Sequence, residues 1–217
     1  MQKLTISPSV LSLDYADMNG QIAQLCKSKA QWLHFDVMDG HFVPNLTFGP
    51  DLLKGFKKAS GLVMDVHLMV SDPFTVSKWF IAAGADIITF HLEACKDIND
   101  CLSLCKEIRS QGKQAGVSVK PNTSITELLP YLDQMDLVLV MSVEPGFGGQ
   151  AFMADMLDKV RMLRAEIETR KLATRIQIDG GINQETGRLA VQAGCDTLVA
   201  GSYVFRSDII KAIDSLL

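Results

Sequence analysis

Short apolar runs alternate with amphipathic helical stretches along the whole 217-residue chain, and this alternation restricts the fold more than any other feature. The expected strands are 3–9, 31–37, 62–68, 85–91, 113–119, 135–142, 174–179 and 196–201. The expected helices lie near 16–28, 50–59, 74–83, 98–111, 124–132, 152–169, 184–193 and 207–216. Strands that are apolar along their length, such as residues 137–141, are typical of parallel sheets buried on both faces.

This pattern predicts an α/β fold, a single-domain (β/α)8 TIM barrel that spans residues 1–217. Eight strand-helix units without a strand-only or helix-only block favour a closed barrel. The sequences around Gly84 and Gly194 are alike, and each predicts a helix that stops at glycine before a new strand. A doubly wound open sheet is the structural alternative.

Composition narrows the class of protein. The net charge is −4 and the basic residues are spread along the chain, whereas a nucleic-acid surface needs a clustered basic face. We read no signal peptide at the N-terminus, and no stretch has the roughly 18 apolar residues of a membrane span. The five cysteines contain no C-x-x-C pair. We therefore expect a cytoplasmic protein with reduced thiols and no nucleic-acid or membrane partner.

Histidine and aspartate side chains gather where the predicted strands end. In a parallel barrel these ends meet at one face, where active sites form. His34 and Asp36 point to the same side of their strand because they are two residues apart. With the residues that end the third and seventh strands, they form a candidate site for a divalent metal ion: His34, Asp36, His67 and Asp179. Each residue taken alone fits a capping or salt-bridge role better, and only the four together at strand ends favour the metal site.

The two aspartates of this set suit proton transfer at a carbon atom. Asp36 and Asp179 lie on the second and seventh strands, so they would approach a central ligand from different sides. One could remove a proton and the other return one on the opposite face, as general base and general acid. A metal ion would stabilise the resulting enediolate as a Lewis acid.

Two further groups of residues surround these strand ends. Met38, Met69 and Met141 predict an apolar surround that keeps water from an enediolate, although ordinary core packing explains them equally well. Three glycine-rich turns follow the last three strands and together predict a phosphate site. They contain Gly146, Phe147, Gly148, Gly149, Gly180, Gly181, Gly201 and Ser202, and Ser9 could hold the other end of the substrate. Lys120 also ends a strand, so a Schiff-base aldolase is a different enzyme class to consider.

These motifs resemble the ribulose-phosphate 3-epimerase family over essentially the whole chain. The resemblance is carried by Ser7-Pro8-Ser9-Val10-Leu11, by residues 34–45, by Asp65-Val66-His67-Leu68-Met69-Val70, by residues 145–150, by Asp179-Gly180-Gly181 and by Ala200-Gly201-Ser202. Lys120 and Glu144 stand where many members have other residues, and neither position is catalytic.

The resemblance implies an isomerase of pentose-phosphate metabolism that interconverts D-ribulose 5-phosphate and D-xylulose 5-phosphate. It makes Asp36 the proton acceptor and Asp179 the donor, and these roles exchange in the reverse direction. It places metal ligands on the set named above, with one divalent ion per subunit (Zn, Fe(II), Mn or Co). It also implies a homo-oligomer, and substrate contacts from Ser9, His67 and the glycine-rich turns. Epimerisation of a hexulose 6-phosphate such as allulose 6-phosphate, and a non-catalytic sugar-phosphate-binding barrel, remain as alternatives.

Overall fold

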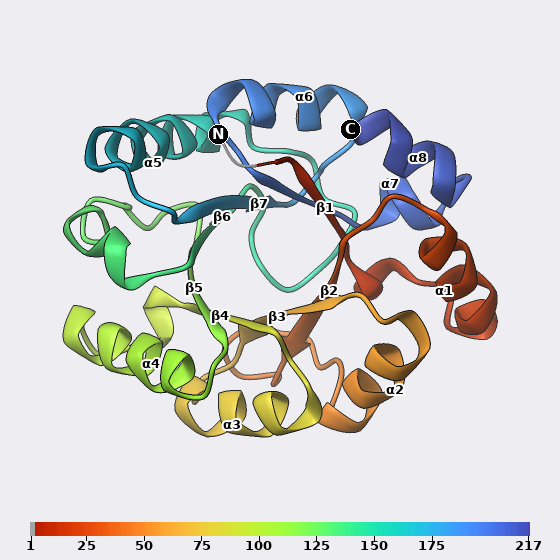
Figure 1. The fold of residues 1–217 in the computed structure, drawn as a ribbon, viewed down its shortest axis with the longest axis horizontal. Helices are drawn as coiled ribbons and strands as arrows, with labels where there is room; N and C mark the ends of the chain where they lie inside the picture. The colour runs from red at the N-terminus through yellow and green to blue at the C-terminus, as the bar shows by residue number, and fades with distance from the viewer. Residues whose placement is uncertain (1–2) are drawn as a thin grey trace.

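A ring of parallel strands surrounded by helices forms the part of the chain that the computed structural model describes, residues 3–217 (Figure 1). The strands are β1 (Thr5–Pro8), β2 (Trp32–Met38), β3 (Val63–Met69), β4 (Ile87–His91), β5 (Gln114–Val119), β6 (Leu137–Met141), β7 (Arg175–Asp179) and β8 (Thr197–Ala200). The α-helices are α1 (Met18–Lys27), α2 (Pro50–Ser60), α3 (Pro73–Ala83), α4 (Ile98–Ser110), α5 (Leu157–Arg170), α6 (Gln184–Ala193), α7 (Ser202–Phe205) and α8 (Ile209–Leu216). The predicted (β/α)8 barrel is confirmed.

The sheet follows the order of the chain around the ring. Each strand pairs in parallel with its neighbour from β2 through β8, and β8 pairs with β1. The seam between β1 and β2 is joined by a parallel bridge between Ser9 and His34. The Ile6 N–H also donates to the side-chain oxygen of Gln31 at 3.0 Å. This arrangement excludes the open doubly wound sheet.

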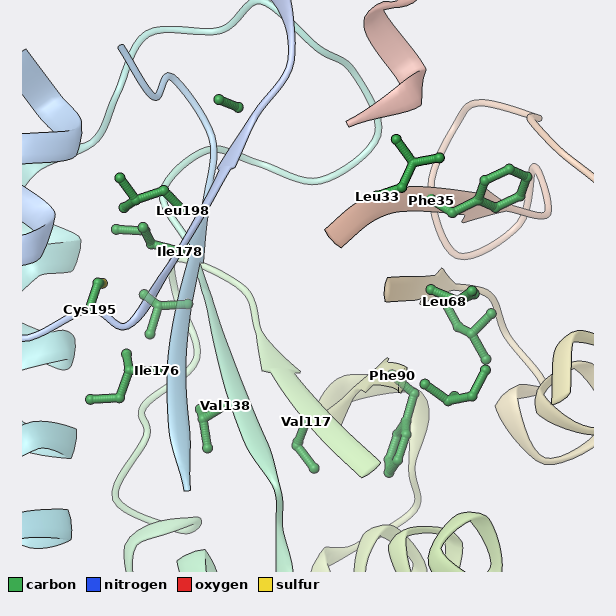
Figure 2. Close-up of a cluster of buried hydrophobic side chains, with 14 of the residues drawn as sticks. Leu33, Phe35, Leu68, Phe90, Val117, Val138, Ile176, Ile178, Cys195 and Leu198 are labelled. Carbon is green, nitrogen blue, oxygen red and sulfur yellow. The ribbon is translucent and has the colours of Figure 1, made fainter. Parts of the chain in front are cut away.

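Alternate residues of each strand face opposite sides of the wall, and the two sides differ in character. Leu33, Phe35, Phe90 and Ile178 point outward into the layer between strands and helices, as Figure 2 shows. Their burial from water is worth about 1.5–3 kcal/mol for each side chain. The alternate residues, including His34, face the barrel interior with other buried polar groups. The main apolar core therefore lies between the barrel wall and the helices, and the barrel interior contains buried polar side chains.

Helix ends follow the local sequence signals. Asp72 and Asp97 accept hydrogen bonds from backbone N–H groups in the first turns of α3 and α4, as N-cap residues do. Gly84 and Gly194 end α3 and α6 in the left-handed conformation that glycine adopts without steric cost. The helix stops predicted at these two glycines are confirmed.

One predicted helix is wrong. The segment near 124–132 forms no α-helix, and a 3-10 helix occupies Leu129–Gln134 (η4) instead. Pro130 lies in its first turn, and its ring lacks the N–H that an α-helix from residue 124 would need to bond Thr126. The other differences are short 3-10 turns, η1 (Val10–Ser12), η2 (Tyr15–Asp17), η3 (Leu92–Ala94) and η5 (Ala154–Met156), together with the short helix α7.

Two further observations concern the described residues. Between residues 3 and 217, no helix has both the length and the apolar character that crossing a membrane requires. The five cysteines are free thiols.

Candidate metal and active site

A pocket opens at the carboxyl ends of the strands. Side chains of β2 and β7 line its floor, the methionines line its wall, and the loops after β6, β7 and β8 form its rim. Its lining includes Ser9, Asp36, Met38, Met69, Met141, Gly146, Phe147, Gly148, Gly149, Asp179, Gly180, Gly181, Gly201 and Ser202. The barrel therefore brings together most of the residues that the sequence singled out.

Four side chains at this floor converge closely enough to share one metal ion. His34, Asp36, His67 and Asp179 each offer one ligand atom, and these atoms lie within 4.8 Å of one another. Asp36 Oδ1 lies 3.3 Å from His34 Nε2 and 3.2 Å from His67 Nδ1. His34, Asp36 and His67 are buried, and Asp179 is half-buried.

The orientation of His34 fits a metal ligand. Its Nδ1 lies 2.7 Å from Asp65 Oδ2, and its buried Nε2 has no hydrogen-bond partner among the described residues. Asp65 Oδ2 also accepts hydrogen bonds from Ser7 and Gln177. Metal-bound histidines commonly donate their other ring N–H to a carboxylate in this way. A set of two imidazoles and two carboxylates suits zinc, iron(II), manganese or cobalt.

Neighbouring charges move the acidities of the two aspartates in opposite directions. Burial alone would raise the pKa of Asp36, but contacts with His34 and His67 hold that pKa well below its usual range. Burial, and then the negative charge of Asp36, raises the pKa of Asp179 to about 7. Burial opposes the charged form of His34, yet Asp65 and Asp36 raise its pKa well above the ordinary value. The surroundings thus favour the ionised form of Asp36 and oppose ionisation of Asp179.

Ser9 contacts a predicted catalytic residue. Its hydroxyl donates to Asp36 Oδ2 at 2.5 Å and accepts from the N–H of Leu11. Ser9 and Asp36 both line the pocket, so the hydroxyl and the carboxylate lie side by side at the space that a substrate would fill.

Hydrogen bonds extend from His67 away from the metal cluster. His67 Nε2 lies 2.9 Å from His91 Nε2, and His91 Nδ1 lies 3.1 Å from Glu93 Oε2. Burial lowers the pKa of His91 to about 4, although Glu93 opposes this shift. The ring of Phe42 packs on His91, and the ammonium of Lys120 lies 4.0 Å from the Phe42 ring centre. Lys120 is not among the residues that line the pocket, which argues against the Schiff-base aldolase.

The glycine-rich turns bring the backbone close to the pocket. Gly146, Gly180 and Gly181 have positive φ angles of 124°, 123° and 62°. A Cβ at Gly180 would lie 2.6 Å from the Val143 side chain, and one at Gly181 would lie 2.5 Å from the Phe152 backbone nitrogen. Both positions therefore require glycine. Ser202 is half-buried at the same rim, whereas Phe147 is 55% exposed.

The three methionines are buried against this pocket. Met38 and Met69 pack with Val43, and Met141 packs with Val143. They supply an apolar boundary beside the carboxylates, which is compatible with both their packing role and the predicted surround of an enediolate.

Several residues of the site escaped the sequence argument. Asp65 and Glu93 contact histidines from beneath or beside the pocket, Gln177 donates to Asp65, and Ser12 lines the pocket. Asp65 and Gln177 could have been placed in the interior, because they lie two residues before His67 and Asp179 and so face inward one layer deeper. The contact between them crosses the barrel and has no sequence signal.

Comparison with known proteins identifies relatives along nearly the full chain. A model of the Ribulose-phosphate 3 epimerase family matches residues 5–205. Ribulose-phosphate 3-epimerase of Bacillus subtilis is 42% identical over 215 residues, which cover 98% of this chain and 98% of the relative. The protein of the same name from Rhodobacter capsulatus is 45% identical over 205 residues, with 94% and 87% covered.

Solved structures with the same fold are more distant in sequence. 3-Keto-L-gulonate-6-phosphate decarboxylase from Vibrio cholerae has a TM-score of 0.72 at 18% identity, with 99% of this chain and 96% of that chain covered. A 3-hexulose-6-phosphate synthase has a TM-score of 0.67 at 17% identity, with 99% and 98% covered. At these identities the likeness concerns the fold alone.

Proposed function

Because this chain belongs to the ribulose-phosphate 3-epimerase family, we propose that it interconverts D-ribulose 5-phosphate and D-xylulose 5-phosphate by moving the proton at C3. The chain is an epimerase, and therefore an isomerase. The observation that carries the proposed mechanism is the convergence of Asp36 and Asp179, with two histidines, within 4.8 Å at the floor of one pocket. Residues 1–217 would act as one barrel domain.

One divalent ion per subunit would be held by His34, Asp36, His67 and Asp179. The donor set supports this assignment, and so does His34 Nε2, which lies 3.3 Å from Asp36 Oδ1 but has no geometrically satisfactory hydrogen bond among the described residues. Zinc, iron(II), manganese and cobalt are the candidates. When bound, such an ion supplies electrophilic stabilisation of the negative charge that develops on substrate oxygens.

The two aspartates would carry the proton on opposite faces of C3. Asp36 is suited to accept the proton, because His34 and His67 favour its ionised form. Asp179, with its pKa raised to about 7, is suited to donate one. In the reverse direction the two roles exchange. The Ser9 hydroxyl, at 2.5 Å, holds the Asp36 carboxylate in place.

The rim and wall of the pocket would bind the rest of the substrate. The glycine-rich turns would let backbone N–H groups approach the phosphate. The residues of these turns that line the pocket, and that would surround the phosphate, are Gly146, Phe147, Gly148, Gly149, Gly180, Gly181, Gly201 and Ser202. Ser9 and His67 would contact the sugar, and Met38, Met69 and Met141 would keep water from the reacting carbon.

A single assay tests reaction type and metal dependence together. Purified protein is mixed with D-ribulose 5-phosphate in deuterated buffer, with and without a chelator, and NMR follows the C3 proton. We expect D-xylulose 5-phosphate that carries deuterium at C3, loss of turnover with the chelator, and recovery on addition of a divalent ion. Substrate binding without exchange would favour the non-catalytic barrel. A parallel reaction with allulose 6-phosphate, if faster, would favour the hexulose alternative.

We also propose that the enzyme works in the cytoplasm as a homo-oligomer. The family resemblance supports the assembly, and the names of the bacterial relatives support a metabolic role. Light scattering coupled to size-exclusion chromatography measures the assembly directly, and a monomeric mass would contradict it.

A further inference from the structure

Four groups form an unbroken line of hydrogen bonds from the metal cluster to the loop after β5. The sequence of contacts is His67 Nε2 to His91 Nε2 at 2.9 Å, His91 Nδ1 to Glu93 Oε2 at 3.1 Å, and Lys120 N–H to Glu93 Oε1 at 2.7 Å. The two imidazoles are fully buried. Each contact needs one donor and one acceptor, so the position of every proton along the line depends on its neighbours.

Glu93 determines which nitrogen of His91 bears the proton. An ionised carboxylate only accepts hydrogen bonds, and Glu93 receives one on each oxygen, from Lys120 N–H and from His91. His91 Nδ1 must therefore carry a proton. In a neutral imidazole the other nitrogen is then a bare acceptor, so His91 Nε2 offers a lone pair to His67.

The same donor and acceptor rule applies to His67. Its Nε2 faces the lone pair of His91 Nε2, and it must donate a proton to make that hydrogen bond. A neutral His67 that donates from Nε2 has a bare Nδ1, which can face a metal ion. Without an ion, the same Nδ1 makes a 3.2 Å hydrogen bond with Asp36 Oδ1, so Asp36 and Glu93 compete for the protons of the two imidazoles. We propose that Glu93, acting through His91, is a positioning residue that favours the tautomer of His67 whose Nδ1 lone pair faces the metal site. This inference depends on the proposed role of His67 as a ligand.

Packing around His91 holds the line in one arrangement. The Phe42 ring lies 4.9 Å from the His91 ring, centre to centre, and the Lys120 ammonium lies 4.0 Å from the centre of the Phe42 ring. The His91 and His67 ring centres are 5.0 Å apart. A rotated His91 would have to displace these rings, so a change of tautomer is the easier response to a change at Glu93.

Glu93→Gln makes this response measurable with almost no change in shape. A glutamine side chain has one acceptor oxygen, while its nitrogen only donates. If the oxygen accepts from Lys120 N–H, the amide nitrogen faces His91 Nδ1 and favours the tautomer with the proton on Nε2. That proton then faces His67 Nε2, and His67 shifts to the tautomer whose Nδ1 is protonated and cannot bind a metal ion.

The experiment combines two readouts on the full chain. Nitrogen-15 NMR of histidine-labelled, metal-free protein reports the tautomer of His67, and competition with a chromophoric chelator reports the affinity for Zn²⁺. We expect Glu93→Gln to contain more of the Nδ1-protonated form of His67 than the wild type does, and to bind Zn²⁺ about 10- to 100-fold more weakly. The matched control is Glu107→Gln, which removes a carboxylate that pairs with Lys78 on the outer helices, and it should behave as the wild type.

A second variant tests His91 itself. His91→Phe keeps a ring against Phe42 but leaves His67 Nε2 without an acceptor, so mixed His67 tautomers and a similar loss of Zn²⁺ affinity are expected. A Glu93→Gln protein with the wild-type proportions of the two His67 tautomers, or with the wild-type affinity for Zn²⁺, would overturn the inference. A wild type that binds no divalent ion would instead contradict the proposed function, and the tautomer measurement would still decide the role of Glu93.

Discussion

Asp36 and Asp179 bring carboxylate oxygens within 4.8 Å of each other although β1 and β8 separate their strands in the barrel wall. Side chains from two different sections of the wall therefore meet over the barrel interior. Their surroundings push the two pKa values apart, downward for Asp36 and to about 7 for Asp179. A pair with one ionised and one partly protonated carboxyl group is what proton transfer across a carbon atom requires.

Replacing either aspartate by asparagine should abolish epimerisation, and the remaining proton exchange should show on which face of C3 each aspartate acts. Both Asp36→Asn and Asp179→Asn are expected to lower turnover by about 10³-fold or more. Asp179→Asn keeps Asp36, so D-ribulose 5-phosphate should still exchange its C3 proton with deuterated solvent without forming product. Asp36→Asn should show the same exchange only with D-xylulose 5-phosphate. NMR of each sugar phosphate in deuterated buffer measures both effects.

The control for these two variants is a check that each one folds like the wild type. Circular dichroism and thermal unfolding should show both variants close to the wild type. Substantial epimerisation by either folded variant would remove the two-base mechanism, and equal exchange from both sugars by one variant would contradict the assignment of faces.

The fold could be predicted from the sequence because parallel barrel strands have a strong pattern of apolar residues. Runs such as residues 137–141 are apolar on both faces, and Gly84 and Gly194 mark the ends of helices in the structure as they do in the sequence. The prediction of an α-helix near 124–132 was wrong because Pro130 breaks the hydrogen-bond pattern of an α-helix, although the other residues of the segment favour a helix. Local propensity could not show that a 3-10 turn would suffice to connect β5 and β6.

The sequence predicted only part of the candidate site. His34, Asp36 and His67 were found because they stand at strand ends two residues apart or on adjacent strands. The contact of Gln177 with Asp65 joins residues 112 positions apart, and the sequence contains no spacing that indicates it. The line from His67 to Glu93 likewise depends on ring orientations that only coordinates provide.

Asp65→Asn should weaken metal binding without touching a proposed ligand. Asp65 Oδ2 lies 2.7 Å from His34 Nδ1, and loss of its negative charge makes His34 a less basic and less well oriented ligand. We expect Zn²⁺ affinity to fall about 10- to 100-fold, measured by competition with a chelator. Asp51→Asn, at an exposed position in the first turn of α2, is the control. A wild-type affinity in Asp65→Asn would exclude the orienting role.

Gly201→Ala should impair substrate binding through a steric effect at the pocket rim. The φ angle of Gly201, −99°, is open to alanine, while its ψ angle of −93° lies outside the usual helical range. The alanine Cβ would, however, lie 2.6 Å from Ser12 Oγ and 3.3 Å from Ser12 Cβ, and the Ser12 side chain would have to move within the pocket. We expect KM for the sugar phosphate to rise about tenfold, a loss of about 1.4 kcal/mol in binding, with kcat less affected. Steady-state kinetics separates the two constants.

Gly55→Ala is the matched control for that substitution. Gly55 lies inside α2, and a Cβ there would have nothing within 4 Å. Alanine should stabilise the protein by about 0.5–1 kcal/mol and leave the kinetic constants unchanged. Similar KM values for both alanine variants would show that the Gly201 effect is not local to the pocket.

The stability that Glu93 contributes should depend on pH in a defined direction. Burial opposes its ionised form, but hydrogen bonds from His91, Thr123 and the Lys120 backbone lower its pKa from 4.5 to about 2. Because the folded-state pKa lies below the unfolded value, this stabilisation is complete above about pH 4.5 and is lost as the pH falls towards about 2. Allowing for solvent screening at the exposed edge of Glu93, we expect its ionised form to stabilise the fold by about 1–2 kcal/mol at neutral pH.

Urea unfolding of the wild type and Glu93→Gln measures the difference in unfolding free energy at about pH 6 and about pH 3. The difference should shrink at the lower pH, since groups that titrate equally in both proteins cancel, and a constant difference would show that the Glu93 charge does not stabilise the fold.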